Sequence, residues 1–192
     1  MQSLPLHFNG PLTFKPGDRC LFTSPLRDSA CVYLWTNRSD RDHRHYIHYV
    51  GEAKSFAKRH REHLIHILGL NYGIFDPTAA RQGIQRLVWP GLWRDKSPDG
   101  PGRLLEQYGQ ITSMVIDYVS SMTVFVAETD VEAGLRKHIE GSIGWNLRNN
   151  HKDCKMLYPD DNHVGRNVTS ASIRLEITAD ETIAGLDPEM EI

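Results

Sequence analysis

The sequence predicts an α+β fold: a single domain in which helices flank a small antiparallel sheet that contains a hairpin. Two segments rich in β-branched and aromatic residues, 30–36 and 46–51, are separated only by the polar residues 37–44. A connection this short joins antiparallel strands. Two later segments, 103–121 and 130–148, repeat apolar residues every three or four positions, as amphipathic helices do.

The first elements are the two strands of the hairpin and a helix. They follow an entry segment, residues 4–29, in which proline and glycine are frequent and no regular element is expected. Gly51 ends the second strand, and Ser55 is placed to cap a helix that runs to His66 or slightly beyond. Four apolar side chains supply much of the inward face of this helix: Phe56, Leu64, Ile67 and Leu68.

An insert, residues 69–122, separates these elements from the rest of the fold. Its first part combines glycine and proline with scattered large apolar residues, which predicts packed loops and short helices. Its last part is the amphipathic helix of residues 103–121. The aromatic side chains of the insert either join the core or offer a surface for nucleobases, and core packing is the more common role. The apolar set of the helix is Leu104, Leu105, Tyr108, Ile111, Val115, Tyr118 and Val119.

A strand and a helix follow the insert. Residues 123–127 predict the strand, and Asp130 is the expected N-cap of a helix that ends near Arg148. Glu140 lies one residue, about 100°, from the apolar stripe of this helix, which places it at the edge of the buried face. Residues 169–178 predict a last strand. The expected domain, residues 1–192, thus has a core of residues 30–68 and 123–148, the insert 69–122 and a C-terminal strand extension, residues 149–192.

Composition predicts a soluble protein. The hydrophobic content of 40% and the charged content of 24% are ordinary for a globular domain, and no stretch approaches the ~18 consecutive apolar residues of a membrane span. The first residues lack the pattern of a secretory signal, so we expect a cytoplasmic protein without a membrane partner. Three cysteines without a Cys-x-x-Cys pair predict buried thiols rather than disulfides or a zinc site.

Charge is distributed unevenly along the chain. The formal net charge of −2 does not by itself indicate a nucleic-acid binder. Residues 38–63, however, hold seven Lys or Arg against four acidic residues, whereas residues 174–192 hold one Arg against six acidic residues. A polyanion would favour the first region and avoid the second.

Two tripeptides on the predicted hairpin are Cys-Val-Tyr at residues 31–33 and Tyr-Val-Gly at residues 49–51. Arg59 follows Tyr49 by ten positions, and His63 follows Arg59 by four, one helical turn later. Glu140 comes on a later helix, after an intervening strand. This ordered set resembles the GIY-YIG nucleases, with a cysteine where the first motif usually has glycine.

The resemblance implies an endonuclease that hydrolyses DNA phosphodiester bonds with one metal ion, Mg²⁺ or Mn²⁺. Tyr33 would contact the attacking water, and Tyr49 would steady the phosphate. Arg59 would bind the phosphate through its fixed, always charged fork. His63 would relay a proton or orient Tyr33, and Glu140 would hold the metal ion. One such centre cuts one strand, so double-strand cutting would require a dimer or two successive nicks.

The resemblance leaves one position open. The family usually carries an asparagine about a dozen residues after the glutamate, and position 152 is lysine in this chain. Several asparagines lie nearby at imperfect spacing: Asn146, Asn149, Asn150, Asn162 and Asn167.

Other hypotheses remain beside the nuclease. Taken singly, each of the five residues has a structural explanation, because strand tyrosines usually pack and charged helix residues usually face solvent. The chain could therefore be a nucleic-acid-binding module that does not cut, or an interaction protein that reuses the fold. A histidine metal site is disfavoured, because His60 and His66 lie about 240° apart around one helix and cannot converge with His63.

Overall fold

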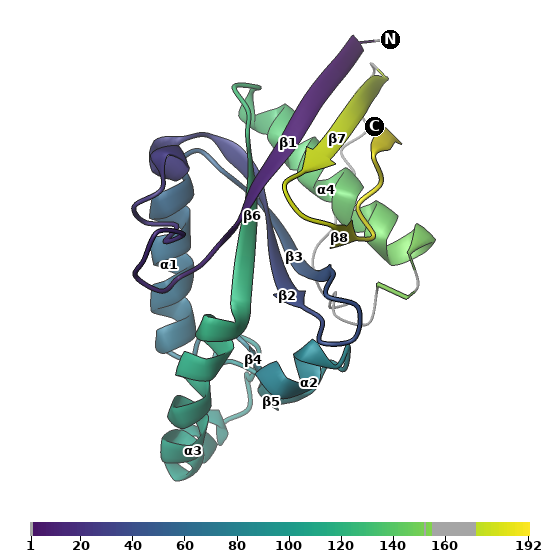
Figure 1. The fold of residues 1–192 in the computed structure, drawn as a ribbon. Coiled ribbons are helices and arrows are strands. Elements are labelled where there is room, and N and C mark those ends of the chain that lie inside the picture. The colour runs from purple at the N-terminus through teal and green to yellow at the C-terminus, as the bar shows by residue number, and fades with distance from the viewer. Residues whose placement is uncertain (1, 152, 155–171) are drawn as a thin grey trace.

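The computed structural model describes residues 2–151, 153–154 and 172–192, and it confirms the α+β class. A seven-stranded sheet in the order β8-β3-β2-β6-β1-β7-β9 forms its centre, with α1 and α4 on opposite sides (Figure 1). A separate two-stranded sheet, β4-β5, lies in the insert. The strands are β1 (Gln2–Leu12), β2 (Cys31–Arg38), β3 (His45–Ala53), β4 (Ile74–Phe75), β5 (Leu87–Trp89), β6 (Met122–Glu128), β7 (Ile173–Ala179), β8 (Ile183–Ala184) and β9 (Glu189–Glu191). The helices are the 3-10 turn η1 (Pro25–Asp28), α1 (Phe56–Leu68), α2 (Pro77–Arg81), α3 (Gly100–Ser121) and α4 (Ala133–Asn150).

The predicted hairpin is present and most strand pairs are antiparallel, but the sheet is larger than predicted and mixed. β2 and β3 are antiparallel, whereas β1 runs parallel to β7, and β3 runs parallel to β8. β1 also corrects the expectation that the entry segment has no regular element. It alternates the buried Leu6 and Phe8 with exposed neighbours, as a half-buried strand does. Its partner β7 lies about 170 positions later in the chain, beyond the reach of any local pattern.

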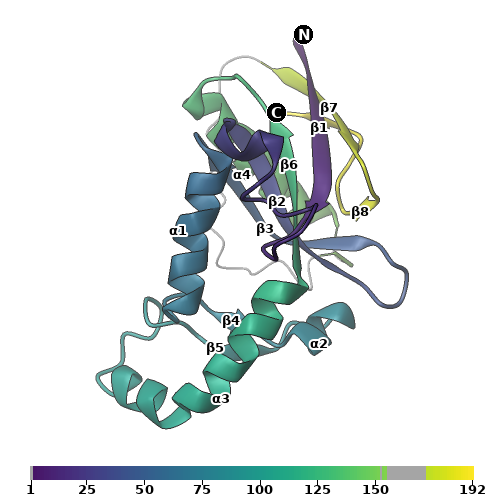
Figure 2. The same cartoon turned by 60° about the vertical axis from the view of Figure 1, so that its left-hand side comes forward.

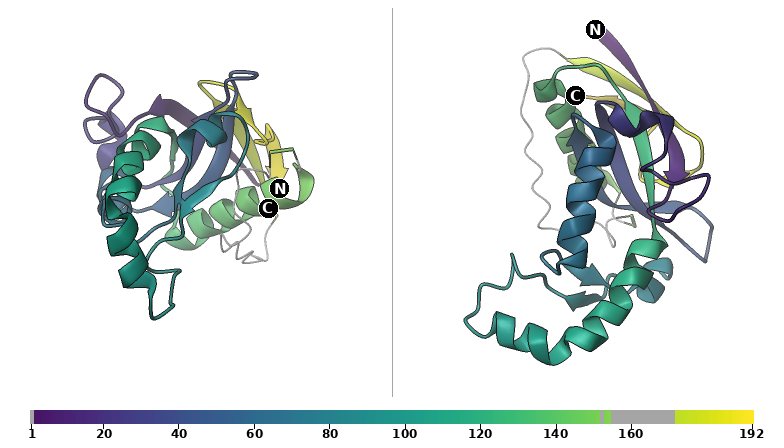
Figure 3. Two further views of the ribbon diagram at one scale, coloured as in Figure 1. Left: turned by 90° about the horizontal axis from the view of Figure 1, so that it is seen from below. Right: turned by 90° about the vertical axis from the view of Figure 1, so that its left-hand side faces the viewer.

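Alternation along β2 gives the sheet a core on each face. Tyr33 and Trp35 point to the side of α1 and α3, and Val32 and Leu34 point to the side of α4. Figure 3 shows α3 and α4 on these opposite sides. The sheet is therefore a middle layer. A site that combines residues of α1 with residues of α4 must lie at one edge of this sheet.

The predicted helices are present with shifted ends and different inward faces. α1 begins after Ser55 as expected, but its inward face contains His60 and His63, while Leu68 is exposed. Apart from Gly100, α3 buries only residues of its second half. Leu105 and Tyr108 are exposed, because the first turns of the helix extend beyond the sheet (Figure 2).

The expected N-cap of α4 is wrong. Asp130 lies in the loop before the helix, which begins at Ala133 with Glu132 at the cap position. The guanidinium of Arg136 donates to the carbonyl of Val131 at 2.6 Å and so ties the loop before the helix to its first turn. Of the last predicted strand, β7 contains residues 173–178, and residues 169–171 lie outside the described residues.

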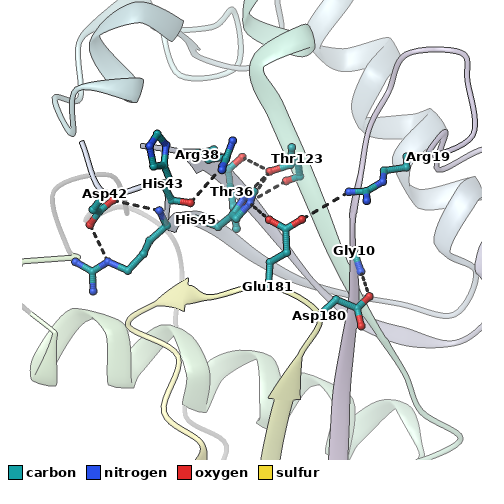
Figure 4. Close-up of polar contacts among 11 residues, drawn as sticks. Gly10, Arg19, Thr36, Arg38, Asp42, His43, His45, Thr123, Asp180 and Glu181 are labelled. Carbon is teal, nitrogen blue, oxygen red and sulfur yellow. Dashed lines mark hydrogen bonds and ion pairs between the residues drawn. The ribbon is translucent and has the colours of Figure 1, made fainter. Parts of the chain in front are cut away.

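The acidic C-terminal segment is bound to the hairpin through a polar network (Figure 4). The buried His45 contacts the carboxylate of Glu181 through Nε2 at 3.1 Å, and its Nδ1 contacts the hydroxyls of Thr36 and Thr123 at 3.2 and 3.1 Å. Burial lowers the pKa of His45, so it is neutral at pH 7. Because a carboxylate only accepts, Nε2 carries the proton and Nδ1 can accept from one of the two hydroxyls. One acidic residue of the extension, Glu181, therefore helps to hold β8 beside β3.

Candidate active site

A cleft of about 830 Å³ lies along the edge of β3, between α1 and α4. β8 pairs only with the first two residues of β3, so within the described residues the rest of that strand has no neighbour on this side. Three of the five predicted site residues line the cleft: Tyr49, Arg59 and Glu140. The other two, Tyr33 and His63, are buried beside Tyr49, with ring centroids 6.1 and 5.7 Å from its ring. The structure thus brings all five residues together.

A β-bulge places Tyr49 on the same face as Tyr33. Trp35 pairs with Tyr49, but the next residue of β2, Thr36, pairs with Ile47, so His48 is an extra residue. In a strand without a bulge, Ile47 and Tyr49 would point to the same side, because side chains alternate with a period of two. The bulge at His48 breaks this alternation, so Ile47 packs on the side of α4 and Tyr49 on the side of α1.

Gly51 makes room for the side chain of Tyr33. The two residues pair directly across the hairpin, and a Cβ at position 51 would overlap the end of the Tyr33 ring and its hydroxyl. The last glycine of the second tripeptide therefore has a steric reason: it lets Tyr33 lie across β3 toward the cleft edge. Cys31, which stands where the first tripeptide usually has glycine, is fully buried, and burial raises the pKa of its thiol to about 12. It packs as a small neutral side chain.

Tyr33 and His63 form a buried hydrogen bond of 2.8 Å between the hydroxyl and Nε2. Burial, together with the neighbouring Tyr49, raises the pKa of Tyr33 well above its usual value, although the guanidinium of Arg59 lowers it. Burial, with the cationic Arg59 adding to it, lowers the pKa of His63 to about 2. Both groups are therefore neutral at pH 7, and the histidine is a fixed hydrogen-bond partner of the tyrosine.

A second histidine and a tryptophan support this pair, and sequence reasoning missed both. His60 Nδ1 lies 2.9 Å from the carbonyl of Phe56, which only accepts, so Nδ1 carries the proton. Its Nε2 then accepts from the indole N–H of Trp35 at 2.9 Å. The ring of His60 lies 4.5 Å from that of Tyr33. Periodicity in the sequence could have indicated both residues. Trp35 follows Tyr33 by two positions and so lies on the same face of β2, and His60 lies one helical turn after the inward-facing Phe56.

Positive charge gathers on the α1 side of the cleft. Lys54, Lys58 and Arg59 line it, and the guanidinium of Arg59 lies 3.3 Å from the carboxylate of Glu62. The Arg59 side chain is 40% exposed, which leaves it accessible to a ligand. The two lysines were not among the predicted site residues, although both lie in the basic region of the sequence. Together the three cations form one wall suited to a phosphate.

Glu140 faces this wall from α4. Burial, together with the nearby Glu52, raises the pKa of its carboxyl to about 7, although Arg59 and Lys137 lower it. Glu52 also lines the cleft, and its carboxylate is bound by the buried Arg136 at 3.1 Å, one helical turn before Glu140. Among the described residues, no ion pair neutralises Glu140. Its negative charge is thus costly without a cation.

No protein-family model matches the chain, and neither the curated proteins nor the solved structures give a match. The geometry of the cleft and its side chains is therefore the basis for a functional proposal. In the described part of the chain, no helix is long and apolar enough to cross a membrane.

The described residues contain no group of three or more His, Cys, Asp or Glu side chains placed to hold a metal ion. The chemistry of the cleft still fits a hard divalent cation, because Mg²⁺ keeps most of its waters and needs only one or two carboxylates. Glu140, with Glu52 beside it, offers such oxygens.

The asparagine of the resemblance remains unassigned. Asn146 is buried on α4, where its amide donates to Asp187 at 2.7 Å, away from the cleft. Asn149 donates to the carbonyl of Trp145 at 2.8 Å, and Asn150 contacts Asn146. Asn162 and Asn167 lie outside the described residues.

Proposed function

We propose that the protein is a metal-dependent endonuclease of the GIY-YIG type that hydrolyses DNA phosphodiester bonds. The observation that carries this proposal is the convergence of Tyr49, Arg59 and Glu140 on one cleft, with the Tyr33–His63 pair behind them. The hairpin of β2 and β3 corresponds to the one that bears the two tripeptides of this family. Hydrolysis needs an oriented water, a group that neutralises the phosphate and a stabiliser of the leaving oxygen.

Each side chain has one task in this scheme. Arg59 grips the scissile phosphate with its fork, and Lys54 and Lys58 attract the adjacent backbone. The hydroxyl of Tyr49 hydrogen-bonds a phosphate oxygen. Tyr33 orients the attacking water through its hydroxyl, and His63 is a positioning residue that fixes the direction of that hydroxyl.

Glu140 would hold one Mg²⁺ or Mn²⁺ ion, with Glu52 next to it. Such an ion supplies Lewis-acid stabilisation of the phosphate and favours ionised forms of water and phenol around it. Because burial keeps Tyr33 uncharged at neutral pH, its service as a general base depends on that cation.

A cleavage assay tests this function. Supercoiled plasmid is incubated with the wild type, with Glu140→Gln and with Glu132→Gln, an exposed glutamate just before α4, in Mg²⁺, in Mn²⁺ and in EDTA. We expect metal-dependent nicking by the wild type and by Glu132→Gln, and a loss on the order of 1000-fold in Glu140→Gln. Absence of cleavage by the wild type, or equal cleavage by Glu140→Gln, would contradict the proposal.

A second candidate function is a binding module that does not cut. The complete burial of Tyr33 favours it, because a catalytic hydroxyl must reach the substrate. In that case the protein binds DNA with a strong salt dependence, measured by fluorescence anisotropy, and the plasmid stays intact in every metal.

A further inference from the structure

A second hollow, which we call the aromatic pocket, opens beside the cleft. Its volume is about 370 Å³, within the range of small-ligand sites. Tyr49 belongs to the walls of both the cleft and the pocket, and His63, the partner of Tyr33, lines the pocket as well. The pocket therefore begins where the phosphate site ends. Its walls also include Trp35, Tyr72, Trp93 and Arg94.

Aromatic rings dominate the walls of this pocket. Trp93 is 55% exposed, although its ring lies only 4.4 Å from the ring of His66 and 5.3 Å from that of Tyr72. Trp35 and Tyr49 also line the pocket, with their rings 5.2 Å apart. An exposed tryptophan held between other rings leaves an apolar surface without a protein partner, and such surfaces often mark ligand sites.

Backbone hydrogen bonds within the insert hold Trp93 at the wall of the pocket. The backbone N–H of Leu92 donates to the carbonyl of Leu70 at 3.0 Å, and that of Trp93 donates to the carbonyl of Asn71 at 3.3 Å. Gly91 permits the close approach, because its φ is +88° and a Cβ there would overlap the backbone of residues 71–73. The position of Trp93 is therefore fixed by the backbone.

We propose that the aromatic pocket binds one unpaired nucleobase of the strand whose phosphate lies in the cleft. This inference rests on the proposed function, because it takes DNA as the ligand of the cleft. Nucleobases are flat aromatic rings, and proteins bind unpaired ones by stacking them on tryptophan and tyrosine. Arg94 at the wall adds positive charge next to the attached backbone. Continuity through Tyr49 places the base and its phosphate in adjoining sites.

The inferred site gives the enzyme a preference for DNA with an unpaired or displaced base near the cutting point. In a regular duplex every base is stacked and paired, so occupation of the pocket requires that a base leave the helix. This costs least where the base has no partner. The substrate class is therefore branched, bulged or mismatched DNA rather than a regular duplex.

Binding in EDTA tests the pocket without requiring cleavage. Anisotropy is measured for a fully paired duplex and for the same duplex with one extra, unpaired 2-aminopurine, whose fluorescence also reports stacking. We expect the wild type to bind the second DNA about 10-fold more tightly and to quench its fluorescence. Trp93→Ala should abolish both effects and leave the affinity for the paired duplex unchanged, and Trp93→Phe should retain part of both.

Trp145→Ala is the matched control, since Trp145 is also exposed, at 39%, and does not line this pocket. It should keep the full preference. Equal binding of the two DNAs by the wild type, or an unchanged preference in a folded Trp93→Ala variant, would overturn the inference. Plasmid cleavage in Mg²⁺ reports separately on the nuclease proposal. Cleavage without the base preference refutes only the pocket, whereas a Trp93-dependent preference without cleavage refutes only the nuclease.

Discussion

Replacing Glu140 with glutamine should stabilise the protein while it removes the proposed activity. The carboxyl has a pKa of about 7 in the folded protein, against a usual value of 4.5, because it is largely buried and lies near Glu52. At pH values between these two pKa values, the folded state therefore still holds a proton that the unfolded state has released. Stability falls as the pH rises through this window, and the loss is complete above about pH 7.

The size of the effect follows from the shift. At about 1.4 kcal/mol per pKa unit, a rise from 4.5 to about 7 corresponds to about 3 kcal/mol. Solvent screening at this half-buried position reduces the figure, and we expect about 2 kcal/mol. For a chain of 192 residues this is a rise in Tm of about 4–8 °C at pH 8.5. Near pH 4.5 the Glu140 carboxyl of the folded wild type is protonated and as neutral as the glutamine of the variant. The difference in stability between the two proteins should therefore vanish.

The measurement is urea and thermal unfolding in EDTA, at pH 4.5, 6.5 and 8.5, for the wild type, Glu140→Gln and the exposed control Glu132→Gln. The control should match the wild type at each pH. Addition of Mg²⁺ at pH 8.5 should stabilise the wild type and leave Glu140→Gln unaffected, because only a ligand that binds the folded state shifts the equilibrium. A glutamine variant that is less stable at pH 8.5, or whose gain does not depend on pH, would refute the reasoning.

Three further predictions concern the residues around Glu140. Gly51→Ala should destabilise the fold by about 2 kcal/mol in urea unfolding, because its Cβ overlaps Tyr33, whereas Gly109→Ala, with open space around it on α3, should stabilise by about 1 kcal/mol; equal effects would contradict the steric role of Gly51. Mg²⁺ affinity, measured by calorimetry, should rise with pH up to about 7 as Glu140 ionises, and Glu52→Gln should move this rise to lower pH; an unmoved profile would exclude the coupling. Arg59→Lys should keep DNA binding but lower kcat by roughly 100-fold, because a lysine cannot reproduce the two-pronged contact; full activity would show that charge alone suffices.

The sequence predicted those parts of the fold that depend on neighbouring residues. The hairpin and α1 could be recognised because a strand, a turn, a second strand and an N-cap follow one another within about forty residues. β1 could not be recognised in the same way, since its pairing with β7 is formed between opposite ends of the chain. Its alternation of Leu6 and Phe8 with exposed residues was present in the sequence, but Pro5 and Gly10 obscured it.

The site shows the same division. Spacing on one helix related Arg59 to His63, and the helical angle placed Glu140 at the edge of a buried face, where the structure has it. Contacts between elements were not predictable: the bulge at His48 and the pairing of Glu52 with Arg136 are visible only when the strands and α4 are assembled. His60 and His63 occupy core positions at which apolar residues would be expected. They can be buried there because their ring nitrogens form hydrogen bonds with Trp35, Phe56 and Tyr33.

The cleft exists because β8 is short. Ile183 and Ala184 extend the sheet beside β3 for two residues only, and had β8 continued, its backbone would cover the edge along which Tyr49 and Glu52 lie. Gly185 prevents this continuation. Its φ is +80°, which turns the chain away, and a Cβ there would lie 2.7 Å from Leu147 and 3.0 Å from Cys154, so another residue at this position would be strained and crowded. The C-terminal extension carries no motif residue, but its short strand β8 covers β3 only at His45 and Tyr46. It thereby leaves open the part of the β3 edge on which the proposed site lies.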